Sequence, residues 1–190
     1  MDDRAKTLDS MMCSCGDLMR AASGDALSLR TPCPDFDVAA LLGHLAVWVQ
    51  VFDAAVNDGE VDFDPRAHHI TSGWSELFDT ARVNIVTGLI ARGIDREMTM
   101  TAMPLAGEFV LNMMLSEYIA HGWDLAKAMG RPQPFSEQEA TVALEAVTAI
   151  LRPEYRGPNM FDTIVEVPTD APAIDRFVGF IGRVPHWSAA

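Results

Sequence analysis

The sequence is poor in cysteine and in basic residues, and long uninterrupted apolar runs are missing. Its three cysteines have no CxxC spacing, which fits neither a disulfide framework nor a thiolate zinc site, so we expect reduced thiols. Lysine and arginine number 14 against 27 acidic residues, a net charge of −13, and no basic cluster stands out to meet a phosphate backbone. No apolar run approaches the about 20 residues that a membrane helix requires. We therefore expect neither a nucleic-acid nor a membrane partner.

The N-terminus also lacks the features of a secretory leader. The opening MDDRAKTLDS carries charges of both signs, and no apolar segment precedes a small-residue cleavage site, which predicts a cytoplasmic protein. The chain has 190 residues, of which 49% are hydrophobic and 22% charged, as is usual for a globular protein. We expect residues 1–190 to form a single domain, and a homodimer is compatible with this composition.

Apolar residues recur at three- and four-residue intervals over several long segments, which is the pattern of helices with one buried face. Residues 95–107 differ, because alternating methionine and threonine there predict an extended segment, which Pro104 and Gly107 are expected to break. Long helices with short to moderate links predict an all-α four-helix bundle with extra C-terminal helices. The expected helices cover residues 3–22, 38–56, 73–91, 108–130, 136–152 and 173–183.

Local signals mark three helix starts. Asp37 is a favourable N-cap for the second helix, since its carboxylate can accept from a free backbone N–H. Ser72 is the expected cap of the third helix. Ser136 and Glu139 have the spacing of a capping box at the start of the fifth helix.

Two ionisable residues interrupt the apolar fourth helix. Glu117 and His121 are four residues apart, so they lie on one helix face with Cβ atoms about 5–6 Å apart. A buried carboxylate costs several kcal/mol unless it is paired or metal-bound. The pair therefore predicts either a metal site or a Glu–His hydrogen bond in a partly wet core.

His44 offers a third ligand from another helix. It lies among Leu41, Leu42, Leu45 and Trp48 on an apolar face where a histidine has no evident packing purpose, although it could be a satisfied core histidine. Together with the Glu–His pair it completes a set of two imidazoles and one carboxylate, which leaves coordination positions open as catalytic sites require. Zinc suits these ligands best, and nickel, cobalt, manganese or ferrous iron can occupy the same set.

Three segments carry a family resemblance. They are T-P-C-P-D-F-D-V-A-A-L-L-G-H, then E-Y-I-A-H-G-W-D-L-A-K-A-M-G, and finally D-R-F-V-G-F-I-G-R-V-P-H-W. In order, spacing and helix placement they resemble the mycothiol-dependent maleylpyruvate isomerase family of the DinB-like superfamily. The resemblance spans most of the chain and implies a DinB-like four-helix fold.

The resemblance also implies roles for particular residues. It implies that His44, Glu117 and His121 bind a divalent metal, and that Asp124 faces the active site as an acid, a base or an orienting group. The alternatives for Asp124 are an exposed helix residue or a partner of a ligand. The implied cofactor is mycothiol or a similar small thiol, and the implied partner is a small electrophilic substrate.

Two departures from the family pattern limit this transfer. Phe36 stands where the family often has tryptophan, an exchange that we expect to affect only packing at the helix entrance. The isomerase of the family carries a further C-terminal domain, and about forty residues after the fifth helix cannot supply a comparable one. We therefore do not expect this chain to share the substrate of that isomerase.

The expected reaction begins with a thiol bound at the open metal position, because coordination removes the thiol proton. The thiolate then either transfers to an electrophile or adds reversibly to a conjugated double bond and so isomerises it. Arg82, in the middle of the third helix, is a candidate for binding a carboxylate of cofactor or substrate. The alternative for Arg82 is a solvated helix face, and the adjacent His68 and His69 are interpreted as surface residues.

Two further functions are compatible with the same ligands. One is a metal-binding, stress-related protein without efficient turnover. The other is a metal-dependent hydrolase in which bound water is the nucleophile and Asp124 or Glu117 assists proton transfer.

Overall fold

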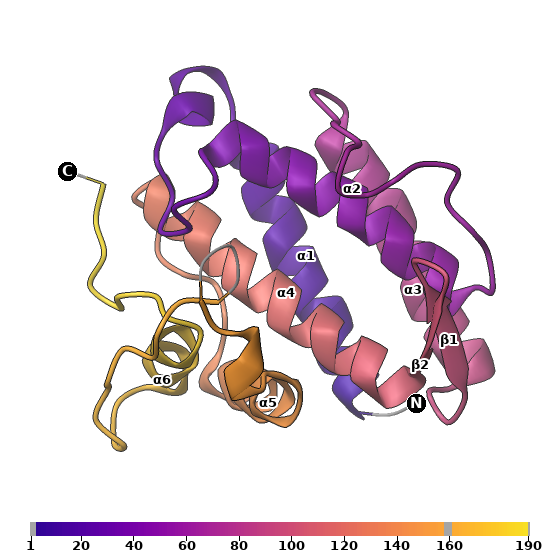
Figure 1. The fold of residues 1–190 in the computed structure, drawn as a ribbon. Helices are drawn as coiled ribbons and strands as arrows, with labels where there is room; N and C mark the ends of the chain where they lie inside the picture. The colour runs from indigo at the N-terminus through magenta and orange to yellow at the C-terminus, as the bar shows by residue number, and fades with distance from the viewer. Residues whose placement is uncertain (1–2, 158–160, 190) are drawn as a thin grey trace.

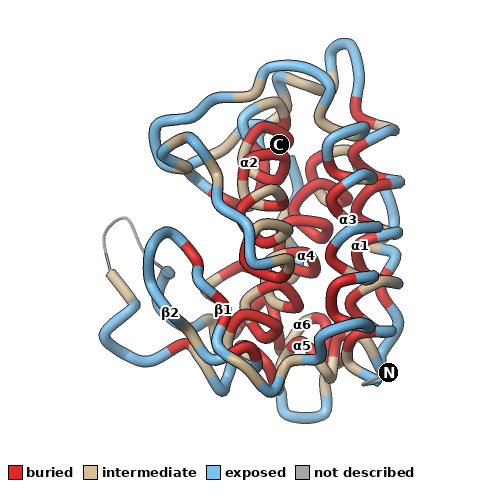
Figure 2. The backbone as a smooth tube through the Cα atoms, turned by 90° about the vertical axis from the view of Figure 1, so that its right-hand side faces the viewer, coloured by how far each residue is buried: buried red, intermediate tan, exposed pale blue. Residues whose placement is uncertain are grey.

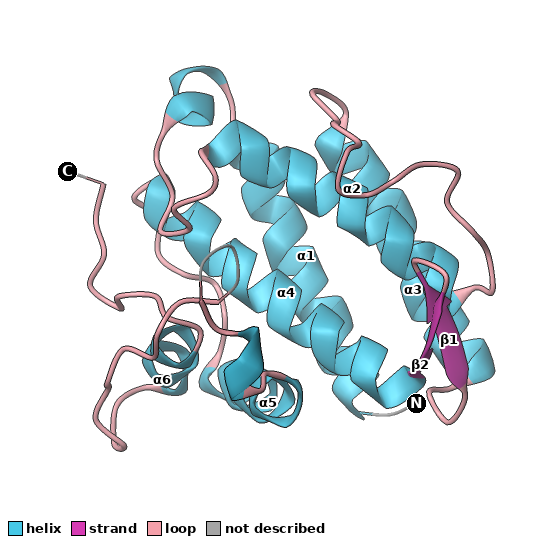
Figure 3. Ribbon diagram, viewed as in Figure 1, coloured by secondary structure: helices cyan, strands magenta, loops and turns pink. Residues whose placement is uncertain are grey.

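Helices make up most of the chain in the computed structural model, which describes residues 3–157 and 161–189 (Figure 3). The expectation of an all-α chain is confirmed, with helix bounds close to those expected. In chain order the elements are α1 (Asp3–Ala21), the short 3-10 turn η1 (Gly24–Ser28), α2 (Val38–Val56), α3 (Trp74–Arg92), β1 (Glu97–Met100), β2 (Met103–Ala106), α4 (Gly107–Ala128), α5 (Glu137–Ile150), the turn η2 (Pro153–Tyr155) and α6 (Ala173–Phe180).

The first four α-helices close into a bundle. Helices α1 and α2 each lie against both α3 and α4, while α5 packs on α4 and α1, and α6 packs on α5. Figure 1 shows α4 running across the middle of the molecule, with α2 and α3 on one side and α5 and α6 on the other. The predicted four-helix bundle with extra C-terminal helices is confirmed, in agreement with a DinB-like fold.

Helix α4 is the central support because protein surrounds it on nearly every side. Leu115, Tyr118 and Ile119 are fully buried, and Trp123 is 1% exposed. Figure 2 shows the buried residues concentrated on the inner sides of the helices. Each large apolar side chain that is removed from water contributes about 1.5–3 kcal/mol, so α4 holds the polar groups it carries in fixed positions.

Helix α2 is more apolar than the sequence analysis allowed. By length and composition alone its 19 residues could cross a membrane, and the expectation that no segment reaches this length was wrong here. In the structure 61% of the apolar window is buried inside the protein, with Leu41, Leu45 and Val49 fully covered. Helix α2 therefore has the burial of a core helix.

Two of the three expected helix caps are confirmed. The Asp37 carboxylate accepts a hydrogen bond from the Ala40 N–H at 2.8 Å, and Ser136 and Glu139 form the expected capping box. The expectation for Ser72 was wrong, because α3 is preceded by Gly73, which makes no side-chain cap. With φ at 70°, Gly73 occupies the left-handed region, where glycine carries no steric cost.

A β-hairpin links the bundle helices α3 and α4. Strands β1 and β2 pair antiparallel, which confirms an extended conformation for most of residues 95–107. The break expected at Pro104 was wrong, because Pro104 lies within β2 opposite Thr99. The hairpin lies against α2 and α4. Its Met98 and Met100 side chains are buried. Thr101 and Ala102 form its two-residue turn with positive φ values of 49° and 64°, as the twist of a tight hairpin requires.

The three cysteines are free thiols, as expected, and differ in accessibility. Cys13 is exposed, whereas Cys15 and Cys33 are buried, and burial raises the pKa of both buried thiols. Because the thiolate is the reactive form, we expect a disulfide reagent such as Ellman's reagent to modify Cys13 alone in the folded chain. In denaturant all three should react. Rapid modification of Cys15 under native conditions would contradict the packing of α1 against α4.

Candidate metal centre

The packing of α2 against α4 brings His44, Glu117 and His121 together. Nε2 of His44 lies 2.7 Å from Oε1 of Glu117, and Nε2 of His121 lies 3.6 Å from the same oxygen. One ligand atom from each residue lies within 4.8 Å of the other two. The set joins one residue of α2 to two residues of α4 and is called the triad below.

Charge in the triad is concentrated on the Glu117 carboxylate. Burial by itself raises the pKa of Glu117, but His121 and His44 outweigh burial and lower the pKa to about 2. Burial lowers the pKa of His121, yet the nearby Glu117 carboxylate and the hydrogen bond to Asp124 more than compensate and raise it. The carboxylate is therefore ionised, which is the form in which it can bind a metal ion.

The donor set of the triad fits a divalent metal. Zinc bonds to imidazole nitrogen and carboxylate oxygen are about 2.0–2.2 Å long, so atoms within 4.8 Å of each other can share one ion after small side-chain rotations. Three protein ligands leave coordination positions for a further molecule. The alternative offered by the sequence, a hydrogen bond between Glu117 and His121, is not formed at their separation of 3.6 Å, and Glu117 shares a hydrogen bond with His44 instead.

Asp124 contacts the ring nitrogen of His121 that does not face Glu117. It lines neither of the two cavities described below. Its carboxylate is fully buried, and Oδ2 lies 3.0 Å from Nδ1 of His121. When Nδ1 donates to Asp124, the lone pair of Nε2 faces Glu117. Of the three roles considered for Asp124, this position fits the orienting group.

Arg183 holds the other side of Asp124 and was not identified from the sequence. Its Nε donates to Oδ1 at 3.2 Å and its Nη2 donates to Oδ2 at 3.3 Å, with both side chains buried. The arginine lies after α6 and is separated from Asp124 by 59 residues. The one available signal was an arginine between Gly182 and Val184 in an otherwise apolar segment.

Arg82 lies outside the triad. Its guanidinium pairs with the carboxylate of Asp9 on α1 and is part-buried between the two helices. It is not among the residues that line the two cavities described below. The structure thus gives Arg82 a partner within the protein, and a contact with cofactor or substrate stays a prediction.

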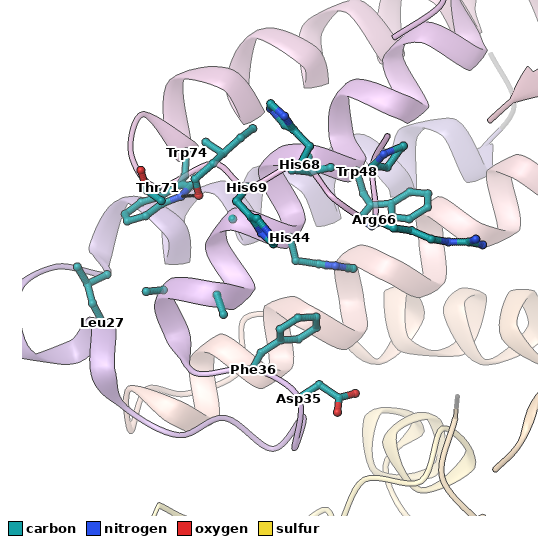
Figure 4. Close-up of a pocket in the computed structure, with 16 residues that line it drawn as sticks. Leu27, Asp35, Phe36, His44, Trp48, Arg66, His68, His69, Thr71 and Trp74 are labelled. Carbon is teal, nitrogen blue, oxygen red and sulfur yellow. Dashed lines mark hydrogen bonds between the residues drawn. The ribbon is translucent and has the colours of Figure 1, made fainter. Parts of the chain in front are cut away.

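The first cavity lies beside His44 and has a volume of about 770 Å³. It is formed by α2 and the loop before α3, as Figure 4 shows. The Ile70 carbonyl of this loop approaches α2 so closely that a Cβ on Gly43 would lie 2.8 Å from the oxygen, which requires glycine. The same carbonyl accepts a hydrogen bond from Trp74 at 2.8 Å. These contacts fix the loop beside the triad.

Polar and basic side chains surround the mouth of the first cavity. His68 and His69 are exposed, as expected, but they also line this cavity together with Arg66. Asp35 is the acidic residue in the same lining. The mouth thus offers several hydrogen-bond donors to a polar ligand.

The second cavity has a volume of about 290 Å³ and lies against Glu117 and His121. Helices α4 and α5 and the segment after α6 form most of its wall. It shares no lining residue with the first cavity, which is lined by His44. The triad therefore lies at the boundary between two separate cavities.

Phe36 has a larger role than the sequence analysis expected. Its ring centroid lies 4.9 Å from that of His44 and 6.2 Å from that of His121. It also lines the first cavity, where Figure 4 shows it close to His44. The expectation that this position affects only the helix entrance was wrong, since Phe36 packs against both imidazoles.

Two known proteins are similar to part of the chain. Two Mycobacterium tuberculosis proteins, MT0763 and Rv0738, both described as uncharacterized, are each 30% identical to the chain over 78 residues. The match covers 40% of this chain and 43% of each relative, so the chain spans less than half the length of these relatives. No solved structure matches significantly.

Residues 13–126 match the family described as the mycothiol maleylpyruvate isomerase N-terminal domain. The matched region contains all three residues of the triad and Asp124, whereas Arg183 lies outside it. It also covers more than half of the 190 residues. The chain belongs to the mycothiol maleylpyruvate isomerase N-terminal domain family.

Proposed function

We propose that this chain binds one zinc ion through His44, Glu117 and His121 and uses a small thiol of the mycothiol type to modify a small electrophile. The observation that carries the proposal is the triad itself, two imidazoles and an ionised carboxylate at the boundary of two cavities. The family match supports a mycothiol-related role. Whether the thiol is transferred or serves an isomerisation depends on the substrate.

The residues of the chain orient the proposed ligands. Asp124 holds the imidazole of His121 by accepting from Nδ1, while Phe36 and Trp48 lie against the ring of His44. When bound, the cation supplies a Lewis acid that lowers the pKa of a thiol to neutral values. The polar mouth of the first cavity offers donors from Arg66 to the polar body of such a thiol.

The two reactions differ in the fate of the sulfur. In a transfer, the thiol proton passes to solvent, sulfur forms a bond to carbon, and the leaving group departs with the electron pair of its own bond. In an isomerisation, sulfur adds to one end of a conjugated double bond, the resulting single bond rotates, and sulfur leaves again. The thiol is then unchanged, and the substrate keeps all its atoms.

An assay of mycothiol with monochlorobimane tests the proposal. We expect zinc-dependent thiol transfer that falls by about a hundredfold or more when a chelator removes the metal, because several kcal/mol of thiolate stabilisation are lost. Added zinc should restore it. Disappearance of the free thiol, monitored with and without protein, provides the measurement.

A second assay, with an ester or an amide and no thiol, separates the alternatives. Turnover there would favour a metal-dependent hydrolase. Zinc binding without turnover of either kind would favour a metal-binding protein without efficient catalysis. Thiol transfer that persists unchanged after complete removal of metal would overturn the proposed role of the triad.

A further inference from the structure

We propose that the second cavity is the binding site for the electrophile and that it takes a neutral, mainly apolar molecule. This inference rests on the proposed function, because it assigns the second cavity a substrate of the same reaction. The two cavities meet the triad through different residues, His44 in the first and the Glu117–His121 pair in the second. Two reactants can therefore approach one centre from separate sides.

The wall of the second cavity consists mostly of hydrocarbon side chains. They come from elements far apart in the sequence, including α4 and the helices α2 and α5, which Figure 1 shows on either side of α4. Transfer of an apolar ligand from water to this wall is favourable in free energy, because the ligand leaves water and contacts these side chains. Prominent members of the wall are Phe52, Phe109, Met113, Val147, Ile150 and Ile181.

The arginine in the wall of this cavity is already paired within the protein. Arg183 contributes to its lining, but both of its contacts go to the Asp124 carboxylate, which neutralises it. A negatively charged ligand body would therefore be buried among mostly apolar side chains without pairing to this guanidinium, and burying such a charge costs several kcal/mol.

The size of the cavity limits the ligand. A dry apolar cavity of about 150 Å³ holds one benzene molecule. At about 290 Å³, the second cavity accommodates a substituted ring or a short alkyl chain. The first cavity, at about 770 Å³ and with a polar mouth, is left for the larger and more polar thiol.

Nitrobenzene and benzoate provide a matched pair of probes, because they share their shape and differ by one negative charge. Both are titrated calorimetrically into the full chain after metal removal, with folding verified by circular dichroism. We expect nitrobenzene to bind about tenfold or more tightly than benzoate. Benzoate binding as tight as that of nitrobenzene would overturn the inference. Because metal is absent, this result is independent of zinc-dependent catalysis.

A pair of cavity-filling variants locates the bound probe. Ala120 lines the second cavity and Ala40 lines the first, so Ala120→Phe and Ala40→Phe add the same volume to different cavities. We expect Ala120→Phe to weaken nitrobenzene binding about tenfold, or 1.4 kcal/mol, while Ala40→Phe leaves it within about twofold. The reverse pattern would place the ligand in the first cavity and overturn the inference. If Ala120→Phe does not fold, Met113→Trp fills the same cavity.

Discussion

Replacement of His121 by alanine is expected to lower zinc affinity by about tenfold or more. The imidazole is 8% exposed, and Asp124 fixes its orientation, so the exchange removes a ligand that the fold holds in place. Two ligands from the triad would remain, and the Glu117 carboxylate would lose one of its two nearby imidazoles. Equilibrium dialysis against zinc, followed by elemental analysis, measures the effect.

His186→Ala is the matched control for this experiment. His186 is exposed and lies outside the residues that line the two cavities, so its removal deletes an imidazole without changing the triad. We expect its zinc affinity to equal that of the unmodified chain. Unchanged zinc stoichiometry and affinity in a folded His121→Ala chain would refute the assignment of the triad as a metal site.

The Asp124→Ala exchange is expected to destabilise the chain by about 3–5 kcal/mol, because it leaves the Arg183 guanidinium buried without its carboxylate. Both oxygens of Asp124 accept from this guanidinium, and the aspartate is fully buried. The free energy of unfolding is measured by urea titration of the metal-free protein. A loss below about 1 kcal/mol would show that Arg183 finds water when Asp124 is removed.

A double variant separates the structural role of Asp124 from its effect on His121. In Asp124→Leu/Arg183→Met both charges are replaced by apolar side chains of similar size, and the stability is expected to return to within about 1 kcal/mol of the original. Zinc affinity should nevertheless stay about tenfold or more below that of the original chain, because nothing then orients His121. Recovery of stability and zinc affinity together would assign Asp124 a purely structural role.

The fold could be predicted in most respects because its signals are local. Apolar spacing identified the helices, and the caps at Asp37 and Ser136 depend on residues three positions away. The error at Ser72 has the same origin, since serine and glycine are both acceptable before a helix. The backbone conformation decides which of the two directly precedes the helix, and here that residue is Gly73, in the left-handed region.

The site could be predicted only in part. Helical spacing alone places Glu117 and His121 on one face, and the structure brings His44 to them as the sequence suggested, although metal binding stays a prediction. Arg183 could not be found in this way, because its contact with Asp124 joins the segment after α6 to α4. Arg82 illustrates the same limit, since nothing in its own helix indicates a partner on α1.

The contact between Arg183 and Asp124 also decides how much of the chain is needed for experiments. The matched family region ends at residue 126, and a fragment trimmed to that boundary would retain every proposed zinc ligand but lose the arginine behind them. Asp124 would then be left with His121 alone among these partners. Weak zinc uptake by such a truncated protein would reflect the missing tail and could not be used to judge the ligands.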